Sequence, residues 1–403
     1  MLKRQALIRK LPAVETLGSV TVICSDKTGT LTENRMTVVI LDVAGHQISL
    51  DENMVRRMPS LSQPDSGDEF TSPKTLPQSI PLLLAGGALC NDATLNISED
   101  GTRFQTMGDP TEGALLIAAA HLGLQPGHLL STLPRIEEIP FDSERKRMTT
   151  VHQFNGQTSA EISSLLGLED QTSNWFSFTK GAVDSLLDIS TQVWVEGKAQ
   201  PLDNKWHKRI LSANDNLAQK GMRVLGIGFR SLLERPKKND LHQLEGELTI
   251  IGIIGMIDPP RPEVKVAVQT CIDAGIRPVM ITGDHPLTAR QIAFELGILP
   301  AQTDTQKELL TGQELNKISD DELSGLVESI SVYARVSPEH KLKIVQALQN
   351  KGQMVAMTGD GVNDAPALKQ ANIGVAMGIT GTDVFKEAAK MVLQDDKCAR
   401  NVA

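Results

Sequence analysis

Three short segments of the chain each follow an apolar run and carry polar side chains suited to phosphoryl chemistry. Residues 20–24 precede DKTGTLTEN, residues 278–281 precede TGDH, and residues 354–357 precede TGDGVND. Apolar runs that end in polar or glycine-containing turns predict buried parallel strands, and the carboxyl ends of such strands gather at one edge of a sheet. We therefore expect the three segments to form one site.

Asp26 is the candidate nucleophile of this site. A carboxylate can attack a phosphoryl group only when the charge repulsion is offset, which calls for Mg²⁺ and cationic or N–H donors. We expect Asp360 to bind Mg²⁺ beside Asp26, because Mg²⁺ takes one or two carboxylates together with phosphate oxygens and waters. The groups expected to contact the phosphoryl oxygens are Thr282, Gly283, Lys341 and Asn363, and we expect Asp364 to shape the metal's surroundings.

Helices alternate with these strands. Apolar residues recur at helical spacing between 263 and 274 after Pro262, and Ser337-Pro338 opens a second helix that Gly352 ends. Alternating strands and helices predict an α/β fold with a doubly wound parallel sheet.

A long stretch that differs in composition and sequence pattern separates the first strand from the later ones, which predicts an inserted α+β domain. We place the first segment of the α/β domain at 1–36, the insert at 37–257 and the second segment at 258–403.

The amino-acid composition argues against several classes of binding partner and structural site. The chain has 40 Lys and Arg against 49 Asp and Glu, a net charge of −9, which is the wrong sign for neutralising nucleic-acid phosphates. Its four cysteines lie far apart without a CxxC pair, so neither a disulfide framework nor a zinc site has support from spacing. The longest apolar run, 248–257, is about half of the ~20 residues that a membrane helix needs.

The three acidic motifs closely resemble the phosphorylation domain of P-type cation-transporting ATPases, which are haloacid-dehalogenase-like proteins. The insert resembles that family's nucleotide-binding domain in GDPTEGALL, PFDSERKRMT, KGA and MRVLGIGFR, and DPPRPEV resembles its exit hinge. The TEN that follows the phosphorylation loop and the DPPR hinge are most similar to the P2 group, especially calcium pumps.

The resemblance implies ATP and Mg²⁺ as cofactors and a role for each matching residue. Glu112 would contact the adenine edge and Phe141 would stack on the adenine ring, as an aromatic face can. The remaining nucleotide contacts implied are Lys146 and Lys180 around adenine and phosphates, Arg223 at the phosphates, Asp284 and Arg335 in the closed site, and Thr28. The implied metal site comprises Asp26, Thr28, Asp360 and Asp364.

Thr28 is informative because soluble phosphatases of the superfamily commonly carry a second Asp at this position as general acid and base. Threonine cannot deprotonate water, so an aspartyl phosphate should persist until another group activates water. In the family that group lies in an actuator domain bearing Thr-Gly-Glu, a tripeptide that does not occur here. We therefore expect a monomeric, soluble cytoplasmic head of a multi-pass membrane pump, whose actuator domain and ion-binding membrane helices lie elsewhere in the parent chain.

The expected function is MgATP binding on the insert and transfer of the γ-phosphoryl group to Asp26, coupled in the parent protein to transport of a cation, Ca²⁺ by resemblance. One alternative is a free-standing phosphatase or phosphotransferase of the same superfamily, against which Thr28 and the large insert argue. The other is a nucleotide-binding module without chemistry, against which the combination of Asp26, Lys341, Asp360 and Asn363 argues.

Overall fold

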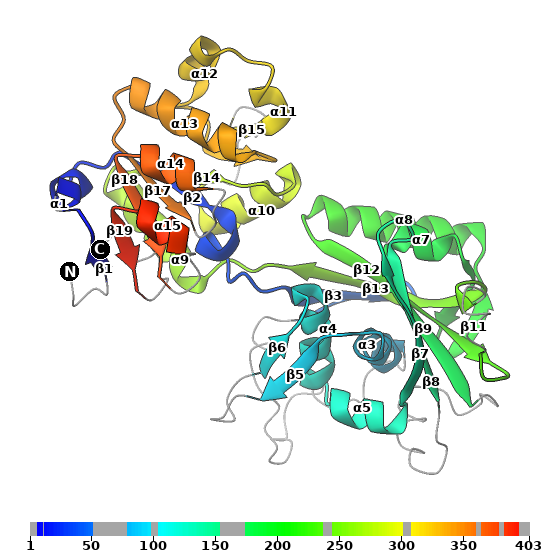
Figure 1. Cartoon of the computed structure of the whole chain (residues 1–403). Coiled ribbons are helices and arrows are strands. Elements are labelled where there is room, and N and C mark those ends of the chain that lie inside the picture. The colour runs from blue at the N-terminus through cyan, green and yellow to red at the C-terminus, as the bar shows by residue number, and fades with distance from the viewer. Residues whose placement is uncertain are drawn as a thin grey trace. The chain divides into compact units, whose positions relative to one another are not determined.

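The computed structural model describes residues 6–10, 12–50, 79–97, 104–153, 174–236, 244–300, 308–359, 364–378 and 383–394. Asp360 and Asn363 lie outside these ranges. The chain divides into two compact units (Figure 1). The split unit comprises Met1–Arg35 and Asp258–Ala403, and the inserted unit comprises Met36–Ile257.

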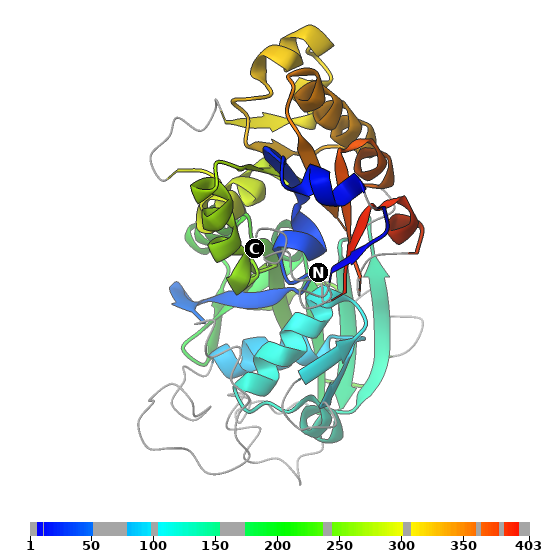
Figure 2. The same cartoon turned by 90° about the vertical axis from the view of Figure 1, so that its left-hand side faces the viewer.

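The split unit is built on an eight-stranded sheet. Its strands, in spatial order, are β1 (Ala6–Ile8), β19 (Met391–Leu393), β18 (Ile373–Met377), β17 (Val355–Gly359), β2 (Val22–Asp26), β14 (Arg277–Ile281), β16 (Val332–Ala334) and β15 (Leu309–Thr311). All neighbouring pairs are parallel except β1 and β19, so segments from the two ends of the chain pair antiparallel at one edge (Figure 2).

Helices cover both faces of this sheet because successive strand residues point to opposite sides. On β14, Val279 and Ile281 pack with α13 (Pro338–Asn350) and α14 (Ala365–Gln370), while Met280 packs with α9 (Pro262–Asp273) and α10 (Pro286–Leu296). The described part of this unit also contains the α-helices α1 (Pro12–Leu17), α11 (Gly312–Leu315), α12 (Asp320–Leu326) and α15 (Asp383–Ala388), and a short π-helical turn, η2 (Lys27–Leu31), directly after β2. The predicted α/β fold with a doubly wound parallel sheet is confirmed.

The strand expected over 20–24 begins and ends two residues later. The reason lies in its neighbour, because β14 pairs with β2 in parallel register through Ile281 and Asp26. Asp26 is therefore the last residue of a central strand rather than part of the loop that follows.

The inserted unit has a nine-stranded, mainly antiparallel sheet. The main path is β11 (Lys198–Pro201), β10 (Ser190–Val195), β13 (Leu248–Ile257), β12 (Arg223–Leu232), β9 (Trp175–Gly181), β8 (Arg147–Gln153) and β7 (Arg135–Asp142). Strand β3 (Thr37–Val43) pairs with β13 and with β4 (His46–Ser49), while β5 (Thr94–Ile97) and β6 (Phe104–Met107) form a separate hairpin.

Among the described residues, the two larger apolar cores of this unit pack against the sheet. One contains α3 (Ser79–Leu89), α4 (Pro110–His121) and a leucine from α5 (Pro126–Thr132), and the other contains α7 (Val183–Leu187) and residues of α8 (Asn204–Gln219). The insert thus has the α+β character expected of it. Within the described ranges, no single helix is long and apolar enough to cross a membrane, although α4 and α5, bent by 87° at their junction, meet those two criteria when joined.

Candidate functional site

Asp26 stands at the carboxyl end of β2, with β17 on one side and β14 on the other. The backbone N–H of Lys27 donates a 2.7 Å hydrogen bond to Asp26 Oδ1, and Lys341 Nζ lies 2.7 Å from Asp26 Oδ2. The Asp26 side chain remains 15% exposed. One carboxylate oxygen is thus held by the backbone and the other by a cation at a strand end that solvent reaches.

Lys341 is brought to Asp26 by the way its helix begins. Ser337 caps α13 by accepting from the His340 N–H, and Pro338 occupies the first turn, where its missing N–H leaves no hydrogen bond unmade. Lys341 follows one turn later, is buried, and also donates to Asp364 at the start of α14. A single ammonium group therefore joins two acidic side chains that are distant in sequence.

The cluster formed by Asp26, Asp364 and Lys341 contains more acidic groups than basic ones. Burial alone would lower the pKa of the Lys341 ammonium, but the carboxylates of Asp26 and Asp364 outweigh it and raise that pKa. Burial, and then the nearby Asp26 carboxylate, raise the pKa of Asp364 to about 7. Two acids share one ammonium, so the pocket favours additional positive charge.

A divalent cation would supply the positive charge that this pocket lacks, and carboxylate oxygens are the ligands that Mg²⁺ prefers. Asp26 and Asp364 therefore fit the metal site predicted from the sequence. In the part of the chain that the structure describes, no three His, Cys, Asp or Glu side chains form a metal-binding group. Asp360, the other predicted ligand, lies outside that part.

The TGDH segment follows β14 directly. Thr282 is buried, its N–H donates to the Tyr333 carbonyl, and its hydroxyl oxygen accepts from the Asp284 N–H at 3.1 Å. At Gly283, a Cβ would meet nothing nearer than the Val336 carbonyl oxygen at 3.9 Å, so the backbone borders open space. Thr282 and Gly283 thus stand at the end of the strand that pairs with β2.

Lys27 provides an ion pair that our sequence interpretation missed. Its ammonium is buried and lies 2.6 Å from Asp284 Oδ2 and 3.6 Å from Asp258 Oδ2. Asp284 also accepts, through its carbonyl, from the N–H of Arg335, whose φ of 53° lies in the left-handed region. Lys27 therefore links the loop after Asp26 both to the TGDH segment and to the DPPR segment.

The loop after Asp26 is held from the hinge side as well. Thr28 is extended and Gly29 has a φ of +71°, a conformation that glycine adopts without strain. Arg261 donates to the carbonyls of Gly29 at 2.9 Å and Thr32 at 3.0 Å, and Asp258 accepts from the Thr32 hydroxyl. The sequence predicts only a hinge for the DPPR segment, although its two charged residues, Asp258 and Arg261, are a signal of this second role.

The predicted nucleotide residues of the inserted unit fall into two groups. In the first, Lys180 at the end of β9 forms an ion pair with Glu112 in the first turn of α4. One residue away, the hydroxyl of Thr111 accepts from Arg223, the first residue of β12. Glu112, Lys180 and Arg223 therefore gather at the beginning of α4, and Thr111 is a member that sequence reasoning missed.

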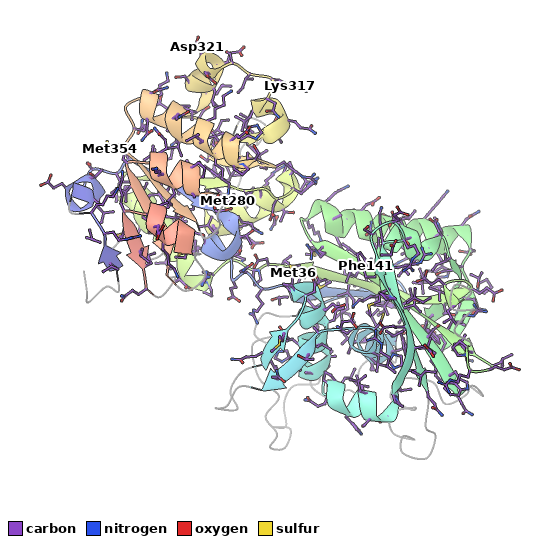
Figure 3. The ribbon with its side chains drawn as sticks, in the orientation of Figure 1. Met36, Phe141, Met280, Lys317, Asp321 and Met354 are labelled. Atoms are coloured by element: carbon purple, nitrogen blue, oxygen red, sulfur yellow. The ribbon has the colours of Figure 1, made fainter. Side chains whose placement is uncertain are left out.

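The second group lies on the hairpin that joins β7 and β8. Phe141 is 63% exposed, which leaves a large aromatic surface facing solvent (Figure 3). Lys146 has a φ of 52°, and its exposed ammonium lies 3.9 Å from Asp184. The Lys146 carbonyl accepts from the N–H of Ala182 at 3.0 Å, which places this hairpin beside the KGA segment that contains Lys180.

A cavity of about 830 Å³ in the same unit contains none of the predicted residues. It is lined at the other end of β12 by Arg230, Leu232 and neighbouring groups, whereas Arg223 opens that strand. The open cavity and the predicted nucleotide residues are therefore separate features.

Comparisons with known proteins agree with this architecture. Residues 79–263 match the family described as P-type ATPase, cytoplasmic domain N, and residues 180–372 match the haloacid dehalogenase-like hydrolases. Calcium-transporting ATPase 1 of Bacillus cereus is 46% identical over 396 residues, covering 98% of this chain and 39% of the relative. The calcium-transporting ATPase of Bacillus subtilis is 43% identical, covering 99% and 42%, and cation-transporting ATPase pma1 of Synechocystis is 41% identical, covering 99% and 41%.

The parallel sheet with an aspartate closing a central strand is that of a haloacid dehalogenase-like hydrolase domain, interrupted by a nucleotide-domain-like insert. Over nearly its whole length the chain is similar to P-type cation-transporting ATPases, as the sequence motifs predicted. It spans about two fifths of the length of the relatives it matches.

Proposed function

We propose that this chain is the catalytic part of an ATP-driven cation pump, and that it binds MgATP on the inserted unit and transfers the γ-phosphoryl group to Asp26. The observation that supports this most strongly is the contact of Lys341 with both Asp26 and Asp364. An ammonium held there can offset charge on the transferred group, because a fixed cation in a poorly hydrated site stabilises developing negative charge.

In the proposed reaction, a carboxylate oxygen of Asp26 attacks the γ-phosphorus while the bond to the β–γ bridging oxygen breaks and ADP leaves. Lys341 donates to the transferring oxygens, as do the Thr282 hydroxyl and the Gly283 N–H. Mg²⁺, which Asp26, Asp360 and Asp364 would hold with Thr28, would neutralise phosphate charge. Asn363 is proposed as a further donor to the phosphoryl group.

The nucleotide is assigned to the inserted unit. Phe141 offers the exposed face for adenine, Glu112 its edge contact, and Lys146, Lys180 and Arg223 the positive charge for the phosphates. Asp284 and Arg335, on the split unit, are proposed to contact the nucleotide in a closed state.

Calcium is the proposed cargo, because relatives that match almost the whole chain are named calcium-transporting and because the TEN and DPPR segments resemble that group. In the proposed parent protein, ion-binding membrane helices and an actuator domain lie outside this chain, which would be its cytoplasmic, monomeric head. The aspartyl phosphate should then be long-lived, since Thr28 cannot act as a general base.

The test is single-turnover labelling with γ-labelled ATP, followed by an unlabelled chase. We expect an acid-stable, hydroxylamine-labile label that is absent from Asp26→Asn and lost slowly from the unchanged chain. General acid–base help contributes about 10²–10⁴-fold, and Thr28→Asp should recover part of it. Label that survives in Asp26→Asn contradicts the mechanism, rapid hydrolysis of small phosphate esters favours a free-standing phosphatase, and the absence of any label favours a module without chemistry.

A further inference from the structure

A buried carboxylate in the inserted unit, Glu245, takes no part in the proposed chemistry. It lies just before β13, and its side chain is only 5% exposed. Its oxygens accept hydrogen bonds from three side chains in the turn of the β7–β8 hairpin and at the beginning of β8. These donors are Arg145, Arg147 through Nε at 2.9 Å, and Thr149 through Oγ1 at 3.1 Å.

The two arginines extend this network across the hairpin. Arg145 Nη2 donates to the Pro140 carbonyl at 2.8 Å, next to Phe141, and Arg147 Nη1 donates to the Ser185 hydroxyl on α7 at 2.9 Å. The Ser185 hydroxyl in turn donates to the Arg145 carbonyl at 2.6 Å. The turn and β8 are therefore tied directly to the Glu245 carboxylate, and β7 is tied to it through the side chain of Arg145.

The turn itself has little freedom to shift. Asp142 accepts from the N–H groups of Glu144 and Arg145, both at 2.9 Å, and Lys146 is held with positive φ. A Cβ at position 181 would lie 2.6 Å from the Lys146 carbonyl oxygen, so only glycine permits this close approach of β9. A change in the contacts of this turn is thus transmitted to Phe141 and Lys146, which the hairpin presents.

We propose that Glu245 is a positioning residue for the nucleotide site, which fixes the hairpin that presents Phe141 and Lys146. The inference rests on the proposed nucleotide role of that hairpin. Without the carboxylate, Arg147 loses the anion it pairs with, and Arg145 keeps the more distant Asp142, whose Oδ1 lies 4.0 Å from its Nε. Repulsion between the two partly buried guanidinium groups then opens the turn. Glu245 acts through Arg145 and Arg147 and touches no nucleotide itself.

The experiment measures ATP affinity by calorimetry on the full chain for four proteins: the unchanged chain, Glu245→Gln, Phe141→Ala and the double variant. We expect Glu245→Gln to weaken ATP binding about threefold to tenfold, in the range of coupling between contacting residues. In a chain that already carries Phe141→Ala, Glu245→Gln should weaken ATP binding by a smaller factor than it does in the unchanged chain. A purely structural role would give equal factors in both backgrounds, and that result would overturn the proposal.

Glu247→Gln is the matched control, because Glu247 lies two residues away, is 72% exposed and pairs only with Arg230 among the ion pairs of the described chain. Its ATP affinity should match that of the unchanged chain. If Glu245→Gln does not fold, Ser185→Ala carries the same prediction, since it removes the hydroxyl that joins Arg145 to Arg147.

The outcomes separate this inference from the proposed function. If the unchanged chain does not bind ATP, both are wrong. If it binds ATP and Phe141→Ala weakens that binding while Glu245→Gln and Ser185→Ala do not, only the role of Glu245 is wrong.

Discussion

Lys341 Nζ lies 2.7 Å from Asp26 Oδ2, although 315 positions separate the two residues. The contact arises because the capped start of α13 and the end of β2 lie at the same edge of the parallel sheet, where α/β proteins generally bind their ligands. The ammonium is also shared with Asp364, so removal of Lys341 would leave two acids together in a largely buried pocket.

Lys341→Ala should reduce the rate of label transfer from ATP to Asp26 by about 10²–10³-fold, the usual cost of losing one preorganised donor to a transition state. ATP affinity should stay unchanged, because the proposed adenine contacts lie on the inserted unit. Rapid-quench labelling gives the rate and calorimetry gives the affinity. Lys343→Ala, on the same helix with a partly exposed ammonium paired to Asp320, is the matched control. Equal labelling rates in the two variants would remove Lys341 from the mechanism.

Phe141→Ala should weaken ATP binding about tenfold, because stacking of a base on an aromatic ring contributes about 1–3 kcal/mol. Leu233→Ala removes another exposed apolar side chain from the same unit, 90% exposed, and should leave affinity unchanged. Calorimetric titration with ATP measures both. An affinity for Phe141→Ala equal to that of Leu233→Ala would exclude stacking at this position.

Fluoroberyllate should bind at Asp26 only together with Mg²⁺, and Asp360→Ala should prevent this binding. The physical reason is that Asp26 and Asp364 repel an anionic phosphate mimic until a divalent cation offsets their charge. Fluorine NMR of the bound mimic reports occupancy. Asp320→Ala, at a carboxylate that is 88% exposed on α12, controls for the loss of one acid. Binding that is equally tight without Mg²⁺ contradicts the site assignment.

The inserted unit should lose stability as the pH falls from about 6.5 to about 4, through His152. Burial lowers the pKa of His152 to about 4, while its Nδ1 bonds to the Leu133 carbonyl and its Nε2 to the Thr150 hydroxyl. Between the two pKa values the unfolded chain binds more protons than the folded one, so stability rises with pH over that window and is complete above it. The effect amounts to about 3 kcal/mol at most.

Urea unfolding followed by tryptophan fluorescence tests this, because all three tryptophans of the chain, Trp175, Trp194 and Trp206, belong to the inserted unit. His152→Gln should flatten the dependence between pH 4 and 6.5. His128→Gln, at an exposed position on α5, should retain it. A slope unaltered by His152→Gln would assign the acid sensitivity to other groups.

The fold class was predictable because its signals are local. The run Val279–Ile281 is apolar and stops at Thr-Gly-Asp, and Ser337-Pro338 has the side chain and the fixed φ that start a helix. Such patterns depend on a few neighbouring residues, and the folded chain has the strand and the helix start that they predict. The register of β2 was harder to predict, since it depends on pairing with β14, and the predicted strand was two residues out of place.

The sequence by itself determined which chemical groups are available at the strand ends: a carboxylate at Asp26, a threonine rather than an acid at Thr28, and an ammonium one turn into α13. Only the tertiary structure decided their partners. Lys27 pairs with Asp284 and Asp258, and Glu245 joins Arg145 to Arg147, across separations that no local pattern encodes. The physical reason is that strand order in the sheets differs from chain order, so the charges that a buried side chain meets are set by packing between distant segments.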